Sequence, residues 1–486
     1  MLKVNEFEQG FDTPASARRD NLIFDDKANQ HFVYHDIDEL LKSNKGRKSL
    51  RDMIEVFLTY QKPRLETLDA YSRGNNETIL SGARRVDERK SDYRVRHNLA
   101  GYISDFVTSY AISQPVSISI KNQTDTTDEI EVIDWENDIV TLNYELGYDA
   151  SRFGRAFELL FRDSSNIDRA VIISPLEIFV IRDDTVERNI IAAVHLPVID
   201  GKIRMSVYTK DDCITYKPFS NNSIRLVEEK RVPHLYKDVP VVEWWNNRFR
   251  QGDFEAVLPL IDAYDAAQSD TANYMSDLND ATLVLRGDLE GAGLNGEAIV
   301  KMEDANILLL QSGEIDGKQT DVSADYIYKQ YDVTGTEAYK ERLLNDIYKL
   351  AKVPNLTDDS FNTTSSGIAL MYKMIGLEQN RAFKVSFFTR ALRRRYELID
   401  NLRKQVNQPR LNAQDLIFTF HANIPQDVWA EIKAVIEAGG YISQQTLLDN
   451  ATFTDYTEEV KRIAKENGAS DLEVNSLIGG DDGEDN

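Results

Sequence analysis

The sequence predicts an α+β protein, mixed and multi-domain, made of several structural units. Three observations support this: a helical pattern of about forty residues at 365–404, alternating apolar runs typical of strands between 156 and 217, and a length of 486 residues. A chain this long buries a large core and divides into about two to four units.

The charge balance excludes several functional classes. The net charge is −24 at pH 7, whereas proteins that bind nucleic acid on their own neutralise phosphates with surplus Lys and Arg. No apolar run approaches the ~18 residues that cross a bilayer, and residues 1–20 lack the layout of a signal peptide. Cys213 is the single cysteine, so no disulfide forms within the chain. These features predict a cytoplasmic protein without membrane contact.

Residues 1–45 are polar and irregular, and we expect an arm rather than part of a core. His31, His35 and Asp36 have a spacing that could hold a metal on a helix, but no further His or Cys lies nearby. We therefore expect no metal site. The next apolar periodicity, at 49–73, predicts a helix that Pro63 breaks into two pieces.

An α/β unit is predicted from about 45 to 250. Apolar spacing indicates helices at 99–110 and 135–153, and alternating residues indicate strands. The expected strands are 116–120, 157–161, 171–173, 178–180, 203–207 and 241–245.

The segment 251–285 contains seven acidic residues and no Lys or Arg. Its apolar positions fit a helix of about six or seven turns with Pro259 near the start, so carboxylates share a helix face. A glycosidase or metal site needs carboxylates that converge from separate elements, which one helix face does not supply. Two interpretations remain: a solvated face, or a surface that repels polyanions.

Strand-like runs at 283–285 and 307–310 flank Gly291–Gly296, which matches G-x-G-x-x-G formally. A dinucleotide site requires such glycines directly between a strand and a helix, so we interpret this segment as a flexible loop. No Walker motif or nucleophile elbow occurs, so we expect neither enzyme activity nor a cofactor. The remaining elements expected are a helix at 336–353 stopped by Pro354, a polar loop, a strand at 416–420, helices at 426–438 and 458–467, and a disordered acidic end at 479–486.

The helix predicted at 365–404 is the longest in the chain. Its apolar residues follow three-and-four spacing without an internal proline, and Thr364, Ser365 and Ser366 can cap its first turn. From 367 to 404 there are nine Lys and Arg against three acidic residues. We expect this basic helix to contact acidic surface within its own fold or on a neighbouring copy; direct contact with nucleic acid is the alternative.

The order of these signals resembles the portal proteins (head-tail connectors) of tailed double-stranded-DNA phages, in particular the large family found in siphophages of Gram-positive hosts. The resemblance spans about residues 50–465, and four patches carry it. They are Asn98–Val116, which ends in Gln114-Pro115-Val116; Leu260–Asp265 with Ser269-Asp270; Ser366–Leu370; and Ile442-Ser443 with Thr446–Leu448. Residues 1–45 and 282–332 depart from the family pattern.

The resemblance implies a ring of about twelve copies at one capsid vertex, through which a separate motor drives DNA. The implied partners are double-stranded DNA that passes without sequence specificity, the terminase large subunit, a head-completion or adaptor protein, the scaffold protein and the major capsid protein. The implied location is the virion, after assembly in the host cytoplasm. The implied units are an arm (1–45), an α/β wing (45–250), a stem helix (251–281), a small α/β clip (282–332), a second stem helix (333–353), a channel loop (354–365), a long wing and crown helix (366–410), a helical crown (411–470) and a disordered acidic tail (471–486).

Combining the residues with this resemblance gives three sets of site residues. A DNA conduit must not bind its cargo, because each phosphate contact has to be broken as the duplex slides. Carboxylates on the wall repel the polyanion where screening over about 8–10 Å is incomplete. We therefore expect Asp262, Asp265, Asp270 and Asp277 to line the channel; Asn355, Thr357, Asp358, Asn362 and Thr363 to form the polar channel loop; and Arg390, Arg393, Arg394 and Arg395 to bind a neighbouring subunit. The alternative function is another ring-forming head or tail protein without a DNA channel.

Overall fold

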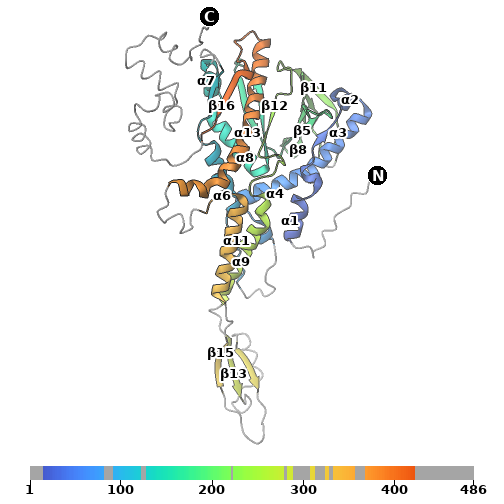
Figure 1. Cartoon of the computed structure of the whole chain (residues 1–486). Helices are drawn as coiled ribbons and strands as arrows, with labels where there is room; N and C mark the ends of the chain where they lie inside the picture. Colours follow the sequence, from blue (N-terminus) through green and yellow to red (C-terminus); the bar gives the residue numbers. More distant parts are fainter. Residues whose placement is uncertain are drawn as a thin grey trace, which may run out of the picture.

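The computed structural model describes residues 15–81, 91–121, 127–220, 223–277, 282–287, 307–311, 323–327, 332–355 and 367–421. Helices and sheets form a broad body, from which a stalk of two helices leads to a small sheet at its far end (Figure 1). This mixture of helices and strands in several units confirms the α+β class that the sequence predicts.

The described part of the N-terminal segment, from residue 15 on, packs into the body, which corrects the expectation of an arm outside the core over residues 1–45. Short elements of this segment dock against a larger core, and Ile23, Phe32 and Leu40 are buried. The sequence did not predict this docking, because a few buried apolar residues are enough to hold such short elements in place, and the rest of the segment is polar. The elements are α1 (Ala15–Ile23), a 3-10 helix (Asp26–Asn29), β1 (Phe32–Val33) and α2 (Ile37–Lys42).

A π-helical turn joins two helices near the proline that was expected to break one. α3 (Asn44–Val56) continues through the turn Phe57–Gln61 into α4 (Lys62–Ser72), with Pro63 in the first turn of α4. Proline is tolerated at that place because the first turn of a helix leaves its N–H groups without helical partners. The short helix α5 (Glu77–Leu80) follows.

The helix expected at 135–153 begins at residue 139, and a separate helix that was not predicted precedes it. In chain order, the two helices are α7 (Thr127–Glu136) and α8 (Ile139–Phe153). Asp138 between them has a left-handed backbone with φ of 46°, which ends the helical ladder. The predicted helix and strand before them are confirmed as α6 (Leu99–Ile112) and β2 (Ser117–Ile120).

The body contains two main sheets. The larger one has the strand order β1-β5-β6-β9-β10-β11, in which β1 and β5 are parallel and the other neighbours are antiparallel. In the smaller one, β3 lies between β12 and β4, and a separate hairpin joins β7 and β8. The strands are β3 (Arg155–Arg162), β4 (Asp168–Ile173), β5 (Ile178–Arg182), β6 (Ile190–His195), β7 (Val198–Ile199), β8 (Lys202–Ile203), β9 (Ser206–Tyr208), β10 (Asp212–Tyr216), β11 (Glu228–Pro233) and β12 (Val241–Trp245).

The longest described helix, α13 (Gly367–Gln405), confirms the helical pattern at 365–404. It crosses the smaller sheet, where Phe388 and Tyr396 are buried in one cluster with Leu146 of α8 and Trp244 of β12. The apolar stripe read from the sequence therefore faces the core of the body, as an amphipathic helix requires.

The stalk consists of α9 (Leu258–Asp277) and α11 (Val333–Ala351), which lie side by side (Figure 1). A 3-10 helix (Glu255–Val257) precedes α9. Beyond the stalk lies a three-stranded sheet. Its central strand, β13, is parallel to β14 and antiparallel to β15. Its strands are β13 (Thr282–Gly287) in the centre, β14 (Ile307–Gln311) and β15 (Ser323–Ile327). The first two of these were predicted.

After α13, a 3-10 helix (Ala413–Asp415) leads into β16 (Leu416–Thr419), which pairs with β2 and confirms the strand expected at 416–420. Several other expected features lie outside the described residues. They are the first residues of the arm (1–14), the glycine-rich segment 291–296, the loop after residue 355, the crown helices 426–438 and 458–467, and the acidic end 471–486.

Candidate functional site

Four acidic side chains bind the body of the same chain near the start of α9, where the stalk (called the stem from here on) leaves the body. We call this region, residues 253–265, the stem root. The first, Asp253, lies just before α9. Its carboxylate accepts hydrogen bonds from Ser151 Oγ (2.6 Å) and Asn246 Nδ2 (3.1 Å) and pairs with Lys384 Nζ of α13 at 2.7 Å. Burial lowers the pKa of Lys384, and the charge of Asp253 opposes that shift. The long helix is thereby tied to the chain that enters the stem.

Glu255 forms an enclosed ion pair with Arg64 of α4. Arg64 Nη2 lies 2.7 Å from Oε2 and 2.8 Å from Oε1 of this carboxylate. The two side chains are 0% and 2% exposed. The N–H of Gly252 also donates to the carboxylate, at 2.9 Å. Because water solvates neither charge, each one depends on the other and on these hydrogen bonds.

Asp262 is buried within the chain, so the expectation that it lines an open channel is wrong. It forms a salt bridge with Arg19 of α1 and accepts a hydrogen bond from Tyr71 OH at 2.8 Å. The first turns of α9 lie inside the body, where the N-terminal segment covers them. A carboxylate in such a place needs donors, and α1 and α4 supply them.

Asp265 is likewise buried, and its expected place on the channel wall is also wrong. It is 0% exposed and accepts hydrogen bonds from Asn76 Nδ2 (2.9 Å) and from the backbone N–H of His97 (3.0 Å). The Nδ1 atom of His97 lies 2.9 Å from the same carboxylate. This side chain fixes the segment before α6 to the stem.

Asp270 and Asp277 lie farther along α9, toward the end of the helix that precedes the small sheet. Asp270 is exposed. Asp277 is the last residue of α9, and its side chain lies outside the described ones. A role for these two acids in lining a channel stays a prediction.

The expected channel loop, 354–365, is described at its first two residues, Pro354 and Asn355. Asn355 donates from Nδ2 to Oδ1 of Asn345 on α11, at 3.2 Å. This contact joins the start of the loop to the stem. The other loop residues lie outside the described part of the chain, and their contact with DNA stays a prediction: Thr357, Asp358, Asn362 and Thr363.

Arg395 of α13 is buried, which corrects its expected place at a subunit interface. Its side chain is 0% exposed, and its Nε donates to Oε1 of Glu158 on β3 at 2.6 Å. Trp244 Nε1 donates to the other oxygen of Glu158 at 3.0 Å. This arginine therefore finds its acidic partner inside its own fold, which was one of the alternatives for the basic helix.

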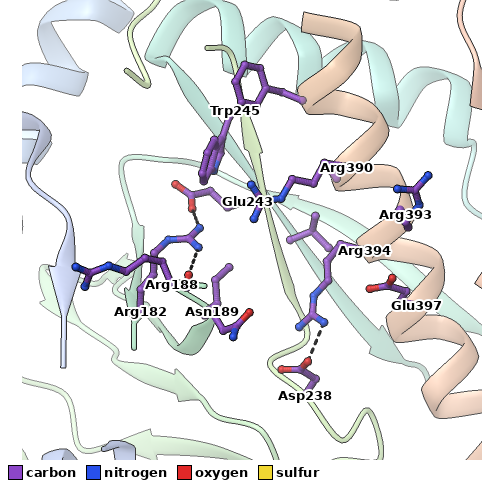
Figure 2. A pocket seen from close by; sticks show the side chains of 14 residues that line it. Arg182, Arg188, Asn189, Asp238, Glu243, Trp245, Arg390, Arg393, Arg394 and Glu397 are labelled. Carbon is purple, nitrogen blue, oxygen red and sulfur yellow. Dashed lines mark hydrogen bonds and ion pairs between the residues drawn. The ribbon is translucent and has the colours of Figure 1, made fainter. Parts of the chain in front are cut away.

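The other three arginines expected at an interface line a pocket between α13, β12 and the β5–β6 hairpin (Figure 2). Arg394 pairs with Asp238 at 2.8 Å. Arg390 and Arg393 are exposed, and the Arg390 guanidinium lies 5.0 Å from the centre of the Trp245 ring. Binding of a neighbouring subunit by these residues stays a prediction.

One carboxylate at the floor of this pocket serves two guanidinium groups. Glu243 pairs with Arg250 Nε at 2.9 Å and also with Arg182. Burial alone raises the pKa of Glu243, but the surrounding arginines outweigh burial and hold the pKa at about 2. Sequence reasoning missed this site. Its signal is the pattern Val-Val-Glu-Trp-Trp at 241–245, because a carboxylate inside a buried strand needs cationic partners.

The two histidines considered for a metal site bind different partners. Nε2 of His31 lies 2.6 Å from Arg250 Nη1, and burial together with the Arg250 charge lowers the pKa of His31 to about 4. His35 binds Glu39. Among the residues that the structure describes, no group of three or more side chains could hold a metal ion, and no helix is long and apolar enough to cross a membrane.

The raised pKa of Asp134 in α7 makes the free energy of unfolding depend on pH. Tyr396 OH donates to its carboxylate at 2.7 Å, and burial raises its pKa from 3.8 to about 6. The unfolded chain then releases this proton at lower pH than the folded chain does. The contribution of Asp134 is therefore full below about pH 3.8 and is lost as the pH rises through about 6.

We expect Asp134→Asn to raise the free energy of unfolding by on the order of 2 kcal/mol at pH 8 and by much less at pH 4. Asparagine keeps an acceptor for Tyr396 and carries no charge that burial penalises. Urea unfolding at both pH values measures the effect. Asp184→Asn, at an exposed position between β5 and β6, is the control and should change neither value. An equal gain at both pH values would show that the titration of Asp134 is not the cause.

The fold defines an elongated α+β protein of several units, in which buried ion pairs fix a helical stem to a broad body. Residues 57–471 match the family described as phage portal protein, SPP1 Gp6-like. The chain therefore belongs to the phage portal protein family, a family of virion components.

A curated relative and two solved structures also resemble this chain. The portal protein of Clostridium phage phiCD119 is 25% identical over 216 residues, which cover 40% of this chain and 48% of the relative, so the chain spans about half the length of that relative. The neck of a native GTA particle computed with C12 symmetry gives a TM-score of 0.42 at 11% identity, covering 72% of this chain and 88% of that one. The neck of an empty GTA particle computed with C6 symmetry gives 0.40 at 9% identity, covering 71% and 88%.

Proposed function

We propose that this chain forms a closed ring of about twelve copies at one vertex of a phage capsid, where it is the conduit for DNA packaging and ejection. The family match over residues 57–471 carries this proposal. The ring assembles in the host cytoplasm among scaffold and major capsid proteins. It docks the terminase large subunit and later a head-completion or adaptor protein. Its own role is structural, and the terminase supplies the energy-driven step.

The contacts at the stem root change which residues can act on the DNA. Asp253, Glu255, Asp262 and Asp265 bind the body of their own chain, so they contribute little field to a channel. We propose that repulsion of the duplex comes from acids farther along the stem, with Asp270 among them, and that the polar loop after residue 355 contacts the duplex without gripping it.

Electron microscopy of the purified protein tests this proposal. We expect end-on views of a ring with an axial hole, and native mass measurement should give an assembly of about twelve subunits of 55.5 kDa each. A chain that stays monomeric at every concentration would contradict the proposal. A closed ring without an axial opening would instead support a head or tail component that has no DNA channel.

A further inference from the structure

The pocket on α13 carries unpaired positive charge. Five arginines and three acids line it. Two of these arginines are paired: Arg182 with Glu243 and Arg394 with Asp238. Arg188, Arg390 and Arg393 are exposed and form no ion pair within the described residues. Figure 2 shows Arg188 on the hairpin side and the other two on α13. The pocket can therefore accept an acidic ligand.

A wall of this pocket contains a buried donor without an acceptor. Arg182 is 8% exposed; its Nη1 donates to the carbonyl oxygen of Arg188 at 2.6 Å and it pairs with Glu243, but its Nε has no partner among the described residues. The cavity measures about 350 Å³, which suits one or two protruding side chains. A DNA duplex carries its phosphates on a convex rod too wide to enter, so the dimensions favour a protein ligand.

The helix α7 lies on the other flank of α13. Tyr396 of α13 binds Asp134 of α7, and Arg403 of α13 binds Glu129 of α7. Tyr396 and Arg403 are seven positions apart, which is about two helical turns, so both contacts lie on one side of α13. Arg394, two positions before Tyr396, projects about 160° away and lines the pocket. Figure 1 shows the same separation, with α7 on one side of α13 and β5 on the other.

The outward face of α7 combines an exposed aromatic ring with a carboxylate. Trp135 is 84% exposed and Val132 is 52% exposed. Glu131, also exposed, lies four positions before Trp135 and therefore on the same face. A tryptophan so far into solvent is typical of the side chains that dominate protein interfaces.

We propose that α7 of one copy inserts Trp135 and Glu131 into the arginine pocket of the next copy. The carboxylate pairs with the guanidinium groups of Arg390 and Arg393, and the indole ring stacks on one of them. Because α7 lies on one side of α13 and the pocket lies on the other, each copy contacts the next one head to tail. Such contacts close into a ring when the rotation between neighbouring copies permits it. The contact also offsets repulsion between copies that each carry a net charge of −24. This inference rests on the ring of the proposed function.

Ring assembly of full-length variants tests the pairing. We expect Trp135→Ala and the double change Arg390→Glu/Arg393→Glu each to raise the concentration needed for ring formation by about tenfold or more. Adding Glu131→Arg to the double change should restore part of the assembly. The matched control is Arg204→Glu/Arg225→Glu, which reverses two exposed arginines outside the pocket and should assemble as wild type does. Thermal unfolding checks that every variant is folded.

Cross-linking between copies gives a second measurement. In a Cys213→Ser background, a Trp135→Cys chain mixed with an Arg393→Cys chain should form a disulfide-linked pair on oxidation, and neither chain alone should form it. If wild type forms rings but the variants assemble normally and no cross-link appears, the pairing is overturned and the proposed function stands. A Trp135 effect without an arginine effect or a cross-link would mean that Trp135 packs on a surface other than the arginine pocket, which also overturns the pairing. A wild-type chain that forms no ring overturns both.

Discussion

Asp265→Lys should unfold the root of the stem, whereas Asp270→Lys should leave the protein folded. Asp265 is 0% exposed and accepts hydrogen bonds from Asn76 and His97, so a lysine there buries an ammonium group among donors. We expect a loss of about 4 kcal/mol or more in the free energy of unfolding. Asp270 is exposed, and reversing its charge should cost less than about 1 kcal/mol. Urea unfolding followed by circular dichroism measures both.

Asp265→Asn separates charge from hydrogen bonding in this experiment. The amide keeps one acceptor for the donors around it, so its loss of stability should lie between those of the two lysine variants. An Asp265→Lys protein as stable as wild type would contradict the buried environment of this carboxylate. Tests of DNA repulsion by the stem therefore need charge reversal at Asp270, because a defect at Asp265 would report misfolding instead.

The sequence alone was enough to predict the long helices that the structure describes. The helices at 258–277, 333–351 and 367–405 each carry an apolar stripe with helical spacing, and packing of that stripe decides most of a helix. The ends were less certain, as the break at Asp138 shows. Helix ends depend on single backbone conformations that periodicity does not encode.

The sequence did not predict which charged side chains are buried and which are exposed. Acids on one face of a predicted helix look equivalent, but the first two turns of α9 are covered by residues far away in sequence. Arg19 and Asp262, for example, are 243 positions apart. Only the tertiary fold decides which part of a helix face such distant segments cover.

The run Arg393-Arg394-Arg395 shows the same limit within a single turn. Because successive helix residues rotate by about 100°, three identical side chains meet three environments. Arg393 is exposed, Arg394 is half-buried beside Asp238, and Arg395 is enclosed with Glu158. Composition predicts a basic helix, but the helix rotation and the sheet beneath it decide which charge is available to a partner.

Arg64→Ala should cost about 3–5 kcal/mol of unfolding free energy, because it leaves Glu255 buried without its cation. The expected cost comes from the stranded carboxylate rather than from the lost attraction alone. A double variant, Arg64→Met/Glu255→Met, should therefore be more stable than either single variant, since it removes both buried charges. Chemical denaturation of the four proteins gives the coupling between the two side chains.

An exposed ion pair supplies the matched control for this cycle. Lys42 and Asp38 pair at 2.9 Å with side chains 67% and 69% exposed, so Lys42→Ala should change stability by less than about 0.5 kcal/mol. A small effect of Arg64→Ala, similar to that of Lys42→Ala, would show that water reaches Glu255. In that case the stem root would not be held rigidly by α4. A large effect confined to Arg64 would mean that α4 and the chain entering α9 unfold as one cooperative unit, because Arg64 lies in α4 and Glu255 lies in the 3-10 helix before α9.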